Sequence, residues 1–192
     1  MLPIDETFAS TLLGAFLGVA APLGISIYLD RRNYQRALDV AFVQCEGYAQ
    51  GVLARARYVM QNLPPNAHRF KTEAPALVAK NFESPETIAP LLTGAYTRFL
   101  RSQDLFLLWQ SEQNLRILFA NLPTAAQADP KMLDAALSHL HEHATRRAWI
   151  VFGMTRKVQP EFSIKSYNGL ITAMSASTDR KLSSVKYEPP IP

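Results

Sequence analysis

The residues best suited to chemistry are three histidines, His139, His141 and His143, which alternate with other residues. On a helix, His139 and His143 lie four residues apart on one face, a spacing that can hold a metal ion. The His-Glu-x-x-His order of zinc proteases is absent, and Glu142 stands off the face that the two histidines share. We therefore interpret this cluster as a solvated polar face. A pH-sensitive contact and a metal-dependent enzyme using His139 and His143 are the alternatives.

Other features that would indicate catalysis are missing from the sequence. The single cysteine, Cys45, cannot form an internal disulfide, and it falls among apolar residues, which favours a structural role over a nucleophilic one. No glycine-rich phosphate loop is present. The formal charge is +4, from 20 basic and 16 acidic residues. The basic residues are spread in pairs, so the sequence indicates no nucleic-acid surface. We expect no cofactor and no enzymatic activity.

One long uncharged stretch dominates the N-terminal part of the chain. Residues 7–29 contain no charged side chain, and as a helix they would extend about 34 Å, against about 30 Å of bilayer hydrocarbon. A cleaved signal peptide would have a basic leading flank, whereas Asp5 and Glu6 precede this stretch. A buried helix of a globular core is disfavoured by the length of the run. The sequence therefore predicts one transmembrane helix over residues 7–29.

The charges on either side of this stretch predict its orientation. Arg31, Arg32 and Arg36 follow it closely, while the preceding flank is acidic. The positive-inside rule then places residues 1–6 outside and the bulk of the chain on the cytosolic or matrix side. The predicted location is a bacterial inner membrane or an organellar inner membrane. The same arginines could contact anionic lipid headgroups, at about 1 kcal/mol per residue.

Small residues inside the predicted span indicate contact with another helix. Gly14 and Gly18 form a GxxxG pair, which Ser10 extends by one step. Such a stripe lets a second helix approach closely, although glycine is also simply frequent in membrane helices. Pro22 cannot donate to the Gly18 carbonyl and should bend the helix there.

Beyond the arginines, apolar residues recur at alternating spacings of three and four, up to the pair Pro64-Pro65. With no proline between Leu23 and Leu63, the span could continue into the domain as one long helix. This stripe is explained by packing within one chain, with an intermolecular coiled coil as the alternative. It consists of Leu38, Phe42, Cys45, Ala49, Val52, Ala56, Val59 and Leu63.

The remaining pattern predicts further amphipathic helices. Helix starts are indicated at Ser84-Pro85 and at Asp129-Pro130, and a helix end is indicated at Pro123. The apolar run 105–109 is too short to span a bilayer, and we expect it to be buried.

The predicted fold class is therefore all-α: one N-terminal transmembrane helix continues into an antiparallel cytosolic helical bundle. The bundle would cover residues 30–160, and residues 161–192 would form a partly extended or disordered C-terminal extension.

These features favour an anchored, non-enzymatic protein. We expect a single-pass accessory subunit or scaffold of a membrane protein complex, whose partners are the lipid bilayer and other membrane protein subunits. A bundle that associates with a second copy of itself, in signalling or sensing, is the alternative.

Overall fold

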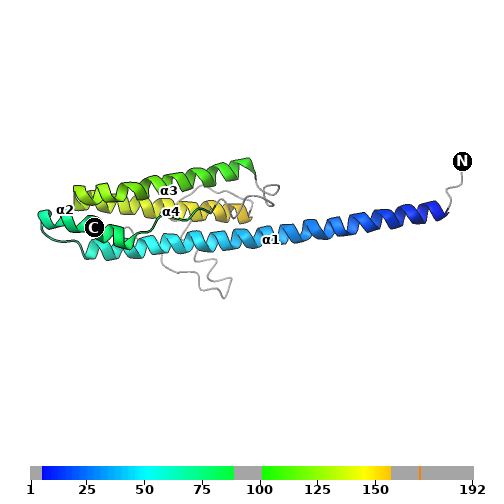
Figure 1. The fold of residues 1–192 in the computed structure, drawn as a ribbon, viewed down its shortest axis with the longest axis horizontal. Helices are drawn as coiled ribbons and strands as arrows, with labels where there is room; N and C mark the ends of the chain where they lie inside the picture. The colour runs from blue at the N-terminus through cyan, green and yellow to red at the C-terminus, as the bar shows by residue number, and fades with distance from the viewer. Residues whose placement is uncertain (1–5, 89–100, 157–168, 170–192) are drawn as a thin grey trace.

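A single long helix forms one side of the molecule, and three shorter helices lie along its second half (Figure 1). The computed structural model describes residues 6–88, 101–156 and 169, with the side chains of 6–13 and 17 excepted. The helices are α1 (Glu6–Gln61), α2 (Ala67–Asn81), α3 (Ser102–Ala128) and α4 (Pro130–Arg156). The described residues contain no strand, so the predicted all-α class and the helical bundle are confirmed.

The helices pack side by side along the bundle, with short connections between α1 and α2 and between α3 and α4. Helix α4 packs against both α1 and α3, and α2 packs mainly against α3. Figure 1 shows α1 and α3 running in one direction and α2 and α4 in the other. Helix α1 continues through Pro22 as one α-helix of 56 residues and ends just before Pro64. The bend predicted at Pro22 stays a prediction.

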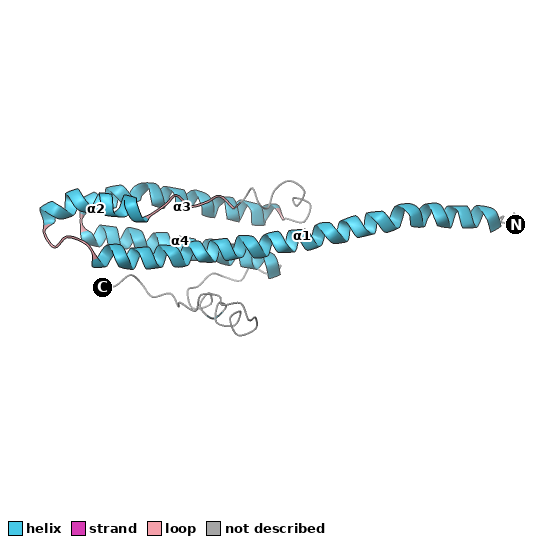
Figure 2. Cartoon of the chain, turned by 60° about the horizontal axis from the view of Figure 1, so that its bottom comes forward, coloured by secondary structure: helices cyan, strands magenta, loops and turns pink. Residues whose placement is uncertain are grey.

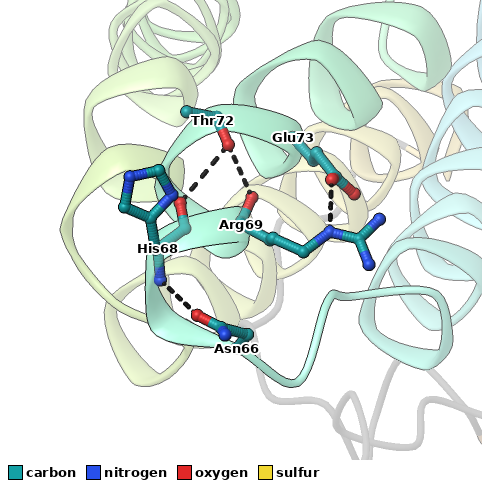
Figure 3. Close-up of polar contacts among 5 residues, drawn as sticks. All are labelled: Asn66, His68, Arg69, Thr72 and Glu73. Carbon is teal, nitrogen blue, oxygen red and sulfur yellow. Dashed lines mark hydrogen bonds and ion pairs between the residues drawn. The ribbon is translucent and has the colours of Figure 1, made fainter.

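Local polar contacts mark the start of α2 (Figure 3). The Asn66 side chain accepts a hydrogen bond from the His68 backbone N–H at 2.9 Å, which makes Asn66 the N-cap. Arg69 pairs with Glu73 one turn later, with Nε and Oε1 2.8 Å apart. The Thr72 hydroxyl donates back to the carbonyls of His68 and Arg69. These contacts lie on the surface and stabilise the helix start locally.

The connection between α3 and α4 is a single residue, Asp129. Its carboxylate Oδ1 accepts a hydrogen bond from the Met132 backbone N–H at 2.8 Å, so the helix start predicted at this residue is confirmed. The helix end predicted at Pro123 is wrong, because α3 continues through it to Ala128. Proline removes one backbone hydrogen bond there, and the burial of Leu122 in the core offsets the loss.

The helix start predicted at Ser84-Pro85 is also wrong. Residues 82–88 are not helical, although they carry the N-cap signal, and Pro85 and Ile88 are buried. The Ile88 backbone N–H donates to the Glu112 carboxylate on α3 rather than to a helical carbonyl. Contact with the bundle therefore outweighs the local helix signal in this segment. The residues that would have continued the helix, 89–100, lie outside the described part of the chain.

The core consists of two apolar clusters along the bundle. The apolar stripe of α1 is buried in both clusters, except Leu63, which is partly buried. The cluster nearer the N-terminus of α1 joins Tyr34, Leu38, Ala41, Phe42 and Cys45 to Ile88, Leu108, Ala148, Trp149, Val151 and Met154. The apolar run 105–109 was predicted to be buried, and this holds only in part. Leu108 is buried, whereas Phe106 and Trp109 are more than half exposed.

The N-terminal half of α1 leaves the bundle and projects beyond the ends of α3 and α4, as Figure 2 shows. Tyr34 is the first buried residue that the structure describes in α1. Before it, seven large apolar side chains are exposed: Phe16, Val19, Leu23, Ile25, Ile27, Tyr28 and Leu29. Within the described residues, no helix is both long enough and apolar enough to cross a membrane. The structure thus does not support the transmembrane helix predicted over residues 7–29.

Candidate functional site

The three histidines occupy different environments on α4. His139 is exposed, with its Nδ1 atom 3.9 Å from Glu142 Oε2, and His143 is half-buried. His141 is only 1% exposed, so the interpretation of a fully solvated polar face is wrong for this residue. In the described parts of the chain, no group of three or more histidine, cysteine, aspartate or glutamate side chains could hold a metal ion.

Burial changes the protonation of two of these histidines. Burial, with a smaller contribution from the Arg57 charge, lowers the pKa of His141 to about 4. Burial also lowers the pKa of His143, while the Glu142 carboxylate opposes that shift. Both imidazoles are therefore stabilised in the neutral form by the fold.

Cys45 faces the interior of the bundle. It is 0% exposed, and burial raises the pKa of its thiol to about 11. The thiolate is the reactive form of cysteine, so this residue is unsuited to nucleophilic chemistry near neutral pH. Cys45 packs within the core cluster that contains Leu38, Phe42 and Leu108.

The residues predicted to set topology and packing lie on the projecting part of α1 or at its base. Arg31, Arg32 and Arg36 are exposed where α1 enters the bundle. A Cβ atom added at Gly14 or Gly18 would meet nothing within 4 Å. Pro22 is exposed on the same projecting part, and the Ser10 side chain lies outside the described residues. No other part of the described chain covers the two glycines.

A buried arginine that the sequence did not single out lies on α4. Arg147 is 1% exposed, and its Nη1 donates to the Glu86 carbonyl at 2.8 Å. Its Cζ atom lies 5.1 Å from the centroid of the Tyr48 ring on α1, a cation–π contact. Arg147 Nε and the Tyr48 hydroxyl are buried without a hydrogen-bond partner. Within the described residues, no acidic side chain forms an ion pair with Arg147.

Arg147 lines a pocket of about 240 Å³ between α1, the 82–88 segment and α4. Gly47 and Gly51 form part of its wall on α1, and a Cβ atom at either glycine would meet nothing within 4 Å. Glu83 and Glu86 are exposed at its rim. The remaining lining residues are Gln44, Tyr48, Arg55, Ser84 and Ile88. A positive charge is therefore buried in the wall, and the acidic side chains remain in solvent.

The spacing of the apolar residues in α4 indicates that Arg147 is buried. Leu133, Leu137, Leu140 and Ala144 are separated by four, three and four residues, and the next step of three reaches Arg147. Arg147 thus falls on the core-facing stripe, although its type suggests a solvent-exposed residue.

Comparisons of the chain with protein-family models, with curated proteins and with solved structures found no match.

Proposed function

We propose that this protein is a single-pass, membrane-anchored helical scaffold that serves as an accessory subunit of a membrane protein complex. The observation that carries the proposal is the exposure of large apolar side chains along the projecting half of α1. Phe16 is 70% exposed and Val19 is 66% exposed, and five more such residues follow up to Leu29. A contiguous apolar surface of this kind is unfavourable in water and is typical of contact with lipid or with another protein.

Length decides how much of α1 the anchor must include. The described side chains from Gly14 to Leu29 would extend about 24 Å as a helix, which is short of the roughly 30 Å of bilayer hydrocarbon. Helix α1 begins earlier, at Glu6, and residues 7–13 carry no charge. The proposal therefore needs the whole stretch 7–29, about 34 Å long, to lie in the bilayer.

The continuity of α1 favours a scaffold. The same helix passes from the projecting half into the core of the bundle, so no loop separates the proposed anchor from the domain. Arg31, Arg32 and Arg36 stand exposed at this junction, where they would contact headgroups on the cytosolic or matrix side of the membrane. The bundle would then be held at a defined height against the membrane surface.

An arginine placed in the proposed anchor tests membrane insertion. We expect Val19→Arg to release the protein from membranes during fractionation at alkaline pH, because arginine near the centre of a span costs about 2.5–3.5 kcal/mol. Val40→Arg is the matched control, since Val40 is also more than half exposed on α1 but lies beside the bundle. We expect this control and the wild type to remain in the membrane fraction.

Recovery of the wild-type protein in the soluble fraction would contradict the anchor, as would equal release of the two arginine variants. In either case the apolar surface of α1 would be assigned to contact with another protein.

The exposed glycines test whether the anchor packs against a partner. In mild detergent, we expect the wild-type protein to elute in a complex larger than one chain and the Gly14→Ile, Gly18→Ile double variant to elute as a single chain. Gly24→Ile is the control, because Gly24 is equally uncovered but lies on another face of the helix. A complex containing only this chain would favour the self-associating alternative. A wild-type protein that elutes as one chain would contradict packing through the stripe.

A further inference from the structure

We propose that the pocket between α1, the 82–88 segment and α4 binds a small oxyanion, either a phosphate or a carboxylate group, whose charge is neutralised by Arg147. This proposal does not rest on membrane anchoring, because the pocket lies wholly within the bundle.

Two residues that line the pocket carry a hydrogen-bond donor that is buried in the wall without a partner. A guanidinium carries five N–H donors and is always charged. Arg147 Nη1 donates to the Glu86 carbonyl, and the buried Cys45 thiol is a second hydrogen-bonding neighbour of the guanidinium, while the Nε atom has no partner. The Tyr48 hydroxyl, also in the wall, is buried without a partner. An oxyanion in the pocket would face the Arg147 charge, and it would bind Nε and the Tyr48 hydroxyl once these two side chains turn toward it.

The positive charge in the pocket wall is buried, whereas the carboxylates of Glu83 and Glu86 at the rim are exposed to solvent, and this difference favours an anion over a neutral ligand. Arg147 is buried, and the half-buried Arg55 also lines the wall. Both arginine charges act on the Tyr48 hydroxyl and oppose the rise of its pKa caused by burial. The buried Glu112 carboxylate accepts a hydrogen bond from the Ile88 backbone N–H. A buried charge is costly unless it is paired and hydrogen-bonded, and a bound anion would supply the opposite charge.

The size of the pocket limits the ligand. Its volume of about 240 Å³ lies below the roughly 300–1,000 Å³ of typical sites for drug-sized molecules. A free phosphate or a small organic acid therefore fits better than a nucleotide. Gly47 and Gly51 contribute no side chain to the wall and so leave this space open.

Thermal unfolding of the full chain in mild detergent tests the proposal, with sodium phosphate in one arm and sodium acetate in the other. Sodium chloride at equal ionic strength is the reference. At a phosphate or acetate concentration ten times the Kd measured by calorimetry, we expect the wild-type Tm to rise by about 3–5 °C. A rise with phosphate alone assigns a phosphate group, and a rise with acetate alone assigns a carboxylate.

Two neighbouring arginines on α4 provide matched variants. Arg147→Met should abolish the rise in Tm, while Arg146→Met, which removes the same charge from an exposed position, should keep it. Because methionine replaces a buried charge that has no ion-pair partner in the described structure, the Arg147→Met variant is expected to fold. Gly51→Leu is a second test, since it fills the pocket and leaves every charge in place. It should also abolish the rise.

An equal rise in Tm for the wild type and for Arg147→Met would overturn the proposal. So would a wild-type Tm that responds to neither anion.

Discussion

Between pH 7.5 and pH 5, the free energy of unfolding is expected to fall by about 2 kcal/mol through His141 alone. Burial lowers the pKa of His141 in the folded chain to about 4, against about 6.5 in the unfolded chain. At pH values between these two pKa values, His141 binds a proton in the unfolded chain but not in the folded chain. Stability is therefore complete above about pH 6.5 and is lost as the pH falls toward 4, by about 3 kcal/mol in all.

Urea unfolding followed by circular dichroism at both pH values measures this loss, and His141→Gln should remove most of it. His139→Gln is the control, because His139 is exposed on the same helix and its replacement leaves the buried His141 in place, so the loss assigned to His141 should persist. Other described groups also contribute to the pH dependence. The lowered pKa of His143 acts in the same direction as that of His141, whereas burial raises the pKa of Glu46 and of Asp134, and these two act oppositely. A His141→Gln profile as steep as that of the wild type would contradict the assignment.

Leu115→Ala is expected to lower the free energy of unfolding by about 2–5 kcal/mol, the largest effect that we predict for a single substitution. Leu115 is 0% exposed and belongs to the core cluster that joins α1, α2, α3 and α4. Truncation to alanine removes apolar contacts and leaves a cavity that rigid helices on several sides cannot close. Urea unfolding at pH 7.5 gives the value directly.

Ile117 provides the control for this substitution. It lies two residues further along α3 and is 58% exposed, so Ile117→Ala removes a similar volume from the opposite face. We expect a loss within about 0.5 kcal/mol there. Similar losses at the two positions would contradict the assignment of faces on α3, and with it the position of the core.

Periodicity and capping were sufficient to predict much of the architecture. The spacing of apolar residues in α1 predicted a long helix, and the absence of proline predicted that it would continue from the uncharged stretch into the bundle. The N-cap at Asp129 was equally predictable, because its hydrogen bond to the Met132 N–H depends only on neighbouring residues. Local signals failed where residues distant in the sequence competed with them. The N-cap signal at Ser84 predicted a helix, but the Ile88 backbone N–H donates to the Glu112 carboxylate on α3 and not to a helical carbonyl.

The candidate site was the least predictable part of the protein. The sequence analysis placed His141 on a solvated face and did not single out Arg147 or Glu112, yet the structure buries all three. The spacing of α4 already places Arg147 on the core-facing stripe, so the signal was present but was outweighed by the usual exposure of charged residues.

The sequence by itself thus determined the all-helical class, the position of the apolar stripes and the long uncharged stretch at 7–29. These follow from composition and spacing along one helix, which are local properties. Only the tertiary structure decided which polar residues are buried and that Tyr48, Glu86 and Arg147 meet around one pocket. That outcome depends on how α1, the 82–88 segment and α4 pack, because a side chain loses its water only when another element covers it.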